Sequence, residues 1–140
     1  MAEYVRTTGD VGALDERVPF LEGAVLAPDA VEAYGQPRVS PEAGTLFEHC
    51  VRAIDKGLKT GAHGLPLIGS GDWNDGMNRV GPAGRGESTW LGFFLHTILG
   101  DFVPLCRGRK EGARADRYMN EARRLATGLE RSWDGEWYRR

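Results

Sequence analysis

A long glycine-rich connection occupies residues 61–86 and has the sequence GAHGLPLIGSGDWNDGMNRVGPAGRG. Eight of its 26 residues are glycine, and DWND at residues 72–75 places two carboxylates, an amide and an indole in consecutive positions. Connections of this length are uncommon in compact domains unless they are functional or disordered. Leu65, Ile68 and Trp73 give it apolar anchors that disordered tracts lack. We therefore expect an ordered loop that presents polar side chains at a site, with glycines that let the backbone approach a ligand closely.

Helical patterns lie on both sides of this loop. Upstream, residues 40–42 (Ser-Pro-Glu) combine a capping hydroxyl, a proline suited to the first helical position and an acid suited to the first turn. The sequence predicts a helix from there to about Leu58. Downstream, we expect Ser88 to cap a helix that Pro104 kinks or ends. A further amphipathic helix is predicted over about residues 111–131.

The N-terminal part of the chain carries weaker signals. A short helix is predicted over residues 10–18, with Asp10 as its N-cap and Pro19 as its stop. Residues 20–39 contain four prolines or glycines and are expected to form an extended connection. No segment shows the alternation of a strand over a useful length. The predicted fold class is therefore all-α, with long loops at one end of the helices.

The predicted helix after Ser88 is apolar around most of its circumference. We expect it to be buried on most sides, with Trp90 in the core. Three other helices supply few neighbours for such a helix. The 140 residues are therefore expected to be one part of a larger domain, incomplete at both ends.

Composition narrows the class of protein. The chain is 41% hydrophobic and 27% charged, with a net charge of −2, which is typical of a globular protein and argues against a nucleic-acid surface. It has no run of about 18–20 consecutive apolar residues, and its first ten residues, MAEYVRTTGD, lack the apolar core that is typical of a signal peptide. Cys50 and Cys106 lie far apart without ligand-spaced partners, so we expect no metal site and no disulfide. This cysteine usage is consistent with the cytoplasm.

The carboxylates of the loop could serve several chemistries. A calcium loop that began at Asp72 would place Gly76 at position 5 and Ala83 at position 12, where an EF-hand needs oxygen ligands. The chain also lacks the glycine pattern of a phosphate-binding loop. Carbohydrate suits the loop better, because an indole stacks on a sugar ring and a carboxylic acid beside it can protonate a glycosidic oxygen. Alternatively, Asp72 and Asn74 build the turn through their own backbone, with Trp73 as core.

Two longer motifs carry a resemblance to a known family. HGLPLIGSGDWNDGMNRVG, followed by GRGESTWLGFFLHTIL, closely resembles the catalytic segment of glycoside hydrolase family 94. These are inverting disaccharide and oligosaccharide phosphorylases. The similarity runs from Tyr4 to the WDGEWYRR ending, and the VRTTGDVGALDERVPFLEG stretch looks most like the β-1,2-glucan branch of the family. The resemblance implies a partial (α/α)6 barrel.

The resemblance also implies roles for residues of the loop. The general acid of the family corresponds to Asp75, and Trp73 corresponds to a residue that lines the sugar site. Asp72 and Glu87 are candidates for binding substrate or for holding the loop, and His63 and Arg85 are expected to be structural. The implied partners are a β-glucan oligosaccharide and inorganic phosphate, with no other cofactor and with the rest of the barrel required. The phosphate ligands of the family lie C-terminal to this segment, so these 140 residues alone are expected to be inactive.

Three hypotheses follow. The leading one is part of a phosphorylase domain that acts on β-1,2-glucan, with a cytoplasmic location that also fits the cytoplasmic domain of a larger inner-membrane protein. The second is a cellobiose-type phosphorylase of the same family with a different linkage. The third is a sugar-binding module that keeps Trp73 but makes no use of Asp75.

Overall fold

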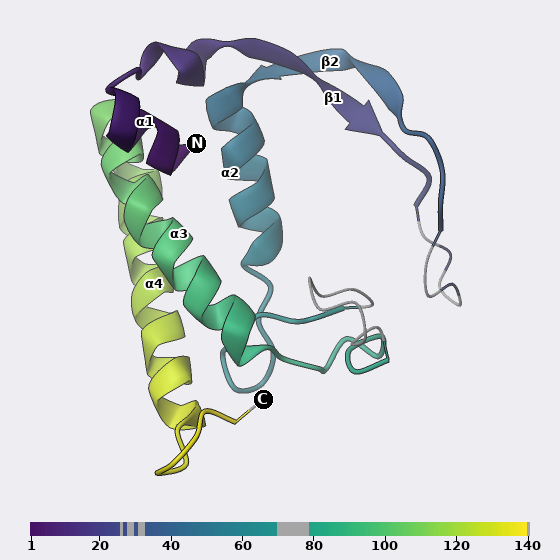
Figure 1. Ribbon diagram of the computed structural model, residues 1–140, viewed down its shortest axis with the longest axis vertical. Coiled ribbons are helices and arrows are strands. Elements are labelled where there is room, and N and C mark those ends of the chain that lie inside the picture. Colours follow the sequence, from purple (N-terminus) through teal and green to yellow (C-terminus); the bar gives the residue numbers. More distant parts are fainter. Residues whose placement is uncertain (26, 28–29, 31–32, 70–78, 140) are drawn as a thin grey trace. The chain divides into compact units, whose positions relative to one another are not determined.

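The computed structural model describes residues 1–25, 27, 30, 33–69 and 79–139. They divide into two compact units, one formed by Met1 and Glu3–Asp55 and the other by Ala2 and Lys56–Arg140. The first unit contains α1 (Ala2–Thr8), the 3₁₀ helix η1 (Gly12–Asp15), strands β1 (Arg17–Glu22) and β2 (Arg38–Thr45), and most of α2 (Leu46–Gly57). The second contains α3 (Thr89–Gly108), α4 (Gly112–Ser132) and the loop before them (Figure 1).

A small antiparallel sheet corrects the all-α prediction. β1 pairs with β2 from Arg17↔Thr45 to Glu22↔Arg38, with a register shift between Pro19 and Leu21. The mainly helical character is confirmed, since the described residues also form four α-helices. Strand alternation was hidden because prolines interrupt both strands. A two-stranded sheet tolerates them, because each strand has one free edge.

The predicted helix over residues 10–18 is wrong in its bounds. The chain is helical at α1, makes only a 3₁₀ turn at η1, and is already extended in β1 when it reaches Pro19. Asp10 does act at the head of the turn, because its Oδ1 accepts a hydrogen bond of 3.2 Å from the backbone N–H of Ala13. The prediction that Asp10 caps the start of a helix was therefore correct, but the helix that follows is only the short 3₁₀ helix η1.

The predicted start of α2 at residues 40–42 is also wrong. These residues belong to β2, and the Ser40 hydroxyl accepts a bond of 3.1 Å from the N–H of Glu42 rather than capping a helix. The helix begins after Thr45, whose Oγ1 accepts from the N–H of Glu48 at 3.1 Å. The Glu48 carboxylate accepts from the N–H of Thr45 at 2.6 Å. This reciprocal pair is a capping box.

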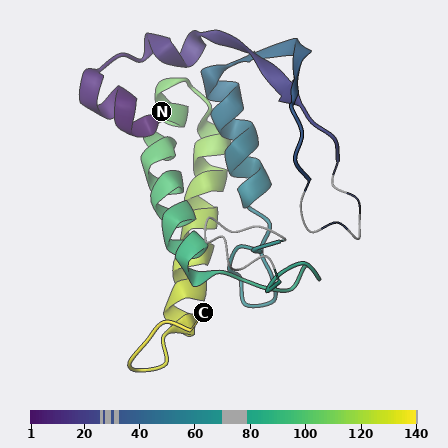
Figure 2. The same ribbon diagram turned by 45° about the vertical axis from the view of Figure 1, so that its right-hand side comes forward.

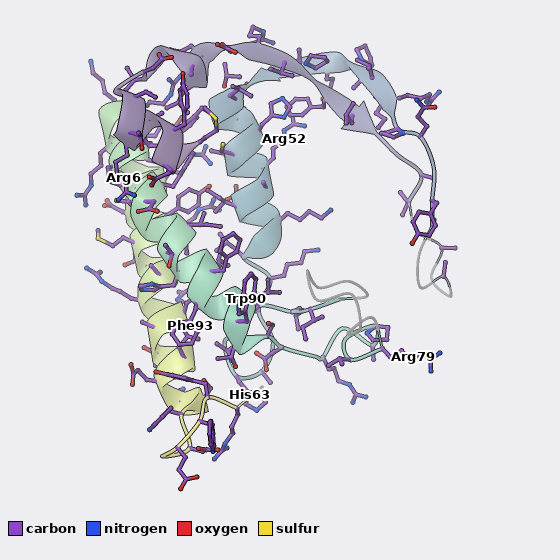
Figure 3. All side chains as sticks on the ribbon, viewed as in Figure 1. Arg6, Arg52, His63, Arg79, Trp90 and Phe93 are labelled. Atoms are coloured by element: carbon purple, nitrogen blue, oxygen red, sulfur yellow. The ribbon has the colours of Figure 1, made fainter. Side chains whose placement is uncertain are left out.

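Aromatic and charged side chains hold β1 against α2 in the first unit. The ring of Phe20 stacks on His49 with centroids 4.1 Å apart, and the guanidinium of Arg52 lies 3.8 Å from the Phe20 ring centroid (Figure 3). His49 Nε2 lies 3.0 Å from the carbonyl oxygen of Val18. These contacts attach β1 to α2 through the aromatic ring of Phe20 and the imidazole of His49.

The second unit is built on a helical hairpin. α3 and α4 lie side by side in both ribbon views (Figures 1 and 2). α4 agrees with the prediction to within one residue at each end. The buried residues on the two helices recur at three- and four-residue spacing, so each helix buries one stripe. Across the hairpin the rings of Phe102 and Tyr118 have centroids 6.2 Å apart.

The N-terminus of α3 agrees with the sequence and its C-terminus does not. Ser88 caps it as predicted, because its hydroxyl accepts a bond of 3.1 Å from the N–H of Leu91. Pro104 neither ends α3 nor marks its boundary, since the helix continues to Gly108. A proline removes one backbone hydrogen bond of the helix, and the bonds on either side of it carry the helix past that point.

α3 is less buried than its composition suggested. Trp90, Phe93 and Phe94 are 44%, 41% and 54% exposed, so the placement of Trp90 in a core is wrong for the described residues. Trp90 stacks on Phe94 at 5.4 Å, and both Trp90 and Phe93 project from the first turns of the helix (Figure 3). By length and composition alone α3 could also cross a membrane, and the core helix of a soluble protein meets the same test.

Candidate functional site

Three of the four predicted site residues lie outside the described residues. Asp72, Trp73 and Asp75 belong to the segment 70–78, so their roles stay predictions. Glu87, the fourth, is described. The described part of the site consists of the two stretches of chain that flank the DWND motif.

These flanking stretches pair with each other. We call residues 65–69 and 81–88 the loop neck. The N–H of Ile68 donates to the carbonyl of Gly86 at 2.9 Å, and the N–H of Ser88 donates to the carbonyl of Pro66, also at 2.9 Å. Leu67 and Glu87 form an antiparallel bridge between these two bonds. Because the neck joins the chain before and after the motif, it fixes where the DWND segment leaves the fold and where it returns.

Glycine permits the close approach of the two sides of the neck. A Cβ placed on Gly81 would lie 2.6 Å from the carbonyl oxygen of Gly69, closer than real Cβ atoms approach a neighbour. A Cβ on Gly86 would lie 2.8 Å from the carbonyl oxygen of Val80. Both obstacles are backbone atoms. A side chain at Gly81 would force the two sides of the neck apart, and a side chain at Gly86 would clash with residues 80 and 81 on its own side.

Replacing Gly81 with alanine is therefore expected to open the neck. Overpacking of this kind costs about 1–3 kcal/mol. We expect faster amide hydrogen exchange in peptides that cover residues 65–69, measured by mass spectrometry on the complete protein. Gly100→Ala is the matched control, because a Cβ there meets no atom within 4 Å and alanine favours a helix. Equal exchange in the two variants would contradict the steric role of Gly81.

Glu87 is the main polar group of the neck. Its side chain is 9% exposed. Oε1 accepts from the backbone N–H groups of His63 at 3.1 Å and Leu65 at 3.0 Å, and Oε2 lies 2.5 Å from Nδ1 of the His63 ring. Gly61 packs directly against this carboxyl group, since a Cβ there would lie 2.5 Å from Cδ of Glu87. The carboxylate thus ties the turn at residues 61–65 to the strand that leaves the loop.

The hydrogen bonds decide the ionisation of Glu87. Burial alone would raise the pKa of this carboxyl. The bond from the His63 ring and the backbone bonds from Leu65 and His63 outweigh burial, and the pKa of Glu87 is lowered from its ordinary value. Glu87 is therefore a carboxylate at neutral pH, and both of its oxygens are occupied by loop donors.

The turn at residues 61–65 also rests on α4. A Cβ on Gly128 would lie 3.1 Å from the carbonyl oxygen of His63 and 3.2 Å from that of Gly64. A larger residue at this position, near the C-terminal end of α4, would press on the turn. The sequence carried a signal for this contact that our prediction did not use, because an isolated glycine inside a helical pattern often marks a close packing approach.

A pocket of about 420 Å³ lies beside the neck. Its lining includes His63, Arg85 and Glu87 from the loop and Arg131 and Arg139 from the C-terminal part of the chain. The imidazole of His63 is 83% exposed, so Glu87 holds a ring that faces solvent (Figure 3). By contrast Arg79, labelled in the same view, extends away from α3 and α4.

Neither cysteine is placed for catalysis. Cys50 and Cys106 are free thiols, and burial raises the pKa of each, which disfavours the reactive thiolate. Over the described ranges, no group of three His, Cys, Asp or Glu side chains is arranged to hold a metal ion.

Comparison with known proteins identifies the family. The family described as "Glycosyl hydrolase 94 superfamily, catalytic domain" matches residues 1–140. The cyclic beta-(1,2)-glucan synthase NdvB of Rhizobium meliloti is 46% identical over 142 aligned residues, which cover 100% of this chain and 5% of that protein. A 3-O-beta-D-glucopyranosyl-beta-D-glucuronide phosphorylase of Paenibacillus borealis is 41% identical over 71% of this chain and 13% of its own length.

A solabiose phosphorylase, also of Paenibacillus borealis, is 32% identical over 96% of this chain and 16% of that protein. The chain thus spans between 5% and 16% of the length of these three relatives. The family match, in contrast, extends over every residue, including the neck and the DWND motif that it joins. On this basis the chain belongs to the glycosyl hydrolase 94 superfamily and forms part of its catalytic domain.

Proposed function

We propose that this chain is part of an inverting glycoside phosphorylase domain that acts on β-1,2-glucan and yields α-glucose 1-phosphate. The observation that carries the proposal is the 46% identity, over the whole chain, to a protein named a cyclic beta-(1,2)-glucan synthase. Two further relatives are named as phosphorylases, which favours phosphate as the acceptor of the glucosyl group. The proposed architecture is an (α/α)6 barrel to which α2, α3 and α4 contribute, and the rest of the barrel is required for activity.

In the proposed mechanism Asp75 is the general acid. A phosphate oxygen attacks the anomeric carbon from the face opposite the glycosidic oxygen, and the carbon–oxygen bond breaks with inversion. The proton of the Asp75 carboxyl passes to the bridging oxygen, and Asp75 is left as a carboxylate. No second carboxylate is needed, because phosphate is already an anion, whereas an inverting hydrolase needs a base to activate water.

The other loop residues have supporting roles in the proposal. Trp73 stacks on the sugar ring, and Asp72 either holds the loop or binds a sugar hydroxyl. Glu87 was a candidate for substrate binding as well, and its occupied oxygens favour the holding role. No cofactor besides inorganic phosphate is proposed. A cytoplasmic location is supported by the two free thiols.

The function is tested by incubating the complete natural protein with β-1,2-glucan oligosaccharides, with and without inorganic phosphate. We expect α-glucose 1-phosphate only when phosphate is present, detected with a coupled phosphoglucomutase assay. Release of free glucose without phosphate would identify a hydrolase instead. Saturable glucan binding without any product would identify a binding module.

A second candidate is a phosphorylase of the same family that acts on another linkage, of the cellobiose type. It is favoured by the relatives named for solabiose and for a glucuronide disaccharide. The same assay with β-1,4- and β-1,3-linked disaccharides distinguishes the two candidates. The linkage with the highest kcat/KM identifies the substrate.

A further inference from the structure

Five half-exposed aromatic side chains lie at one end of the helical hairpin. They come from the beginning of α3 and from the turn that follows α4, and each is between 41% and 54% exposed: Trp90, Phe93, Phe94, Trp133 and Tyr138. The ring of Phe93 meets Tyr138 edge-on with centroids 4.9 Å apart, and Trp133 lies 5.0 Å from Tyr138. Trp90 stacks on Phe94, one turn further along α3. We call these five residues the aromatic face. Single exposed apolar residues are ordinary, but a joined group of this kind marks a contact surface.

The aromatic residues of α3 lie away from the side that packs on α4. The buried stripe of α3 runs through Gly92, Leu95 and Leu99, and a Cβ on Gly92 would lie 3.0 Å from Cδ2 of Leu129 in α4. Successive residues of an α-helix are turned by about 100° around its axis. Trp90 and Phe93 therefore project from the opposite side of the helix (Figure 3). α3 has one apolar side on α4 and a second one facing outward.

The two helices of the hairpin differ in what they expose. Over residues 116–131 of α4 every exposed residue is charged or polar, which is the pattern of a helix with its outer side in water: Asp116, Arg117, Asn120, Arg123, Arg124, Thr127, Glu130 and Arg131. The most apolar stretch of α3, in contrast, has a mean hydropathy of 1.3, and only 33% of it is buried. A helix that is apolar around its circumference is normally covered on all sides. The composition of α3 thus calls for a further neighbour.

A lipid bilayer fits this surface poorly. Asp101 lies near the middle of α3 and is exposed, and a charged side chain at the centre of a bilayer is costly. α4 packs along α3, so its charged outer side would have to enter the lipid as well. A protein surface is therefore the better partner.

The length of the relatives favours a partner within the same polypeptide. The family match is to a catalytic domain, and this chain spans between 5% and 16% of three relatives, so most of each relative lies outside the aligned segment. A helix attached to the same chain is present at a far higher effective concentration than a second molecule. An intramolecular helix would therefore cover the aromatic face before a second copy could.

We propose that the aromatic face is an interface within the complete polypeptide, covered by an apolar helix from another part of the same catalytic domain. That helix presents a stripe of aliphatic side chains to the rings of Phe93, Phe94 and Tyr138. In the proposed barrel α3 then belongs to the inner ring of helices, and α4, with its polar outer side, to the outer ring. The inference rests on the barrel architecture of the proposed function and not on its chemistry.

Hydroxyl-radical footprinting of the complete wild-type protein measures how well the rings are covered. The radical oxidises accessible aromatic side chains, and mass spectrometry gives the rate at each one. An open face predicts that Phe94, which is 54% exposed, reacts about twofold more slowly than in the urea-unfolded protein. We expect protection of about tenfold or more at Phe93 and Phe94, because the centre of an interface excludes water. Protection of about twofold or less at both positions would overturn the proposal.

Arg123→Phe is the matched control for the footprint. Arg123 is an exposed residue of α4 whose guanidinium bonds to Asn120, so the substitution places the same kind of ring on the polar side of the hairpin. The introduced ring is expected to react within about twofold of its rate in the unfolded protein, because that side of α4 faces water. If the introduced ring is protected as strongly as Phe94, the contrast between the two helices is absent and the proposal fails.

A photo-crosslinker identifies what covers the face. Incorporation of p-benzoylphenylalanine at Phe94 keeps an aromatic ring at this position and forms a covalent bond to a neighbouring C–H group on irradiation. We expect a crosslink, within one molecule of the complete protein, to a peptide outside residues 1–140. A crosslink inside residues 1–140, between two copies or to lipid contradicts the proposal.

The wild-type footprint decides the same question if the crosslinker prevents folding. Protection that disappears on dilution would assign the face to a second copy, and protection that appears only with lipid vesicles would assign it to a membrane. Protection that is independent of both supports the intramolecular helix. None of these measurements involves turnover. A covered face in a protein without phosphorylase activity therefore refutes only the proposed function, and an open face in an active phosphorylase refutes only this inference.

Discussion

Phosphorolysis of β-1,2-glucan is expected to fall by about 10²–10⁴-fold when Asp75 is replaced by asparagine, because that is the usual contribution of general acid catalysis. An amide of the same size cannot give a proton to the departing oxygen. The loss should appear in kcat, with KM for phosphate little changed, since phosphate attacks from the other face of the sugar. The measurement is the initial rate of α-glucose 1-phosphate release by the complete protein.

A substrate with a better leaving group separates chemistry from folding in this variant. Fluoride needs little protonation to depart, so the rate with β-glucosyl fluoride and phosphate should stay within about tenfold of wild type. Asp116→Asn, an exposed aspartate of α4, is the control and should retain full activity on both substrates. If Asp75→Asn keeps at least a tenth of the wild-type rate on the glucan, Asp75 is not the general acid.

Replacing Glu87 with glutamine is expected to loosen the loop neck by about 3 kcal/mol, because bonds to a buried charged acceptor are worth about 1.5–3 kcal/mol and an unmatched donor adds to the cost. The amide nitrogen of glutamine would face the N–H groups of His63 or Leu65. That corresponds to roughly a hundredfold faster exchange of the amides at residues 61–69. Exchange is read by mass spectrometry on the complete protein.

The pH dependence gives an independent check on Glu87. Its pKa is lowered in the folded protein, so its contribution is fully present above the ordinary carboxyl pKa and is lost as the pH falls through the lowered value. The difference between wild type and Glu87→Gln should therefore shrink in acid. Glu121→Gln removes only a surface pair with Arg124, worth about 0–1 kcal/mol, and serves as the control. Unchanged exchange at residues 61–69 in Glu87→Gln would refute the holding role.

The C-terminal half of the fold could be predicted because its signals are local. Ser88, the apolar spacing of α3 and the amphipathic face of α4 each act within a few residues. In the N-terminal half the sequence offers two possible starts for α2. Residues 40–42 have the residue types of a helix start, as do Thr45 and Glu48. Pairing of β1 with β2 decided between them, and that contact joins residues up to 28 positions apart, from Arg17 to Thr45.

At the candidate site, too, the local features could be predicted from the sequence and the long-range contacts could not. Spacing along the chain identified the DWND motif and named Glu87 as a candidate, but it could not give the partners of Glu87. His63 lies 24 residues before it, and the contact exists only because the neck brings the two strands together. That Arg85 and Arg131 line one pocket was equally hidden, since α3 and nearly all of α4 lie between them in the sequence.

The neck has a practical consequence for redesign. Its two strands are closed by backbone hydrogen bonds and by Glu87, and Ser88 immediately continues into the cap of α3. The scaffold is therefore complete on both sides of the junctions at Gly69 and Gly81. A replacement of the segment between these junctions would therefore leave the hydrogen bonds of the neck and the cap of α3 in place. Loop variants can be exchanged at these two junctions without altering the helices that carry the loop.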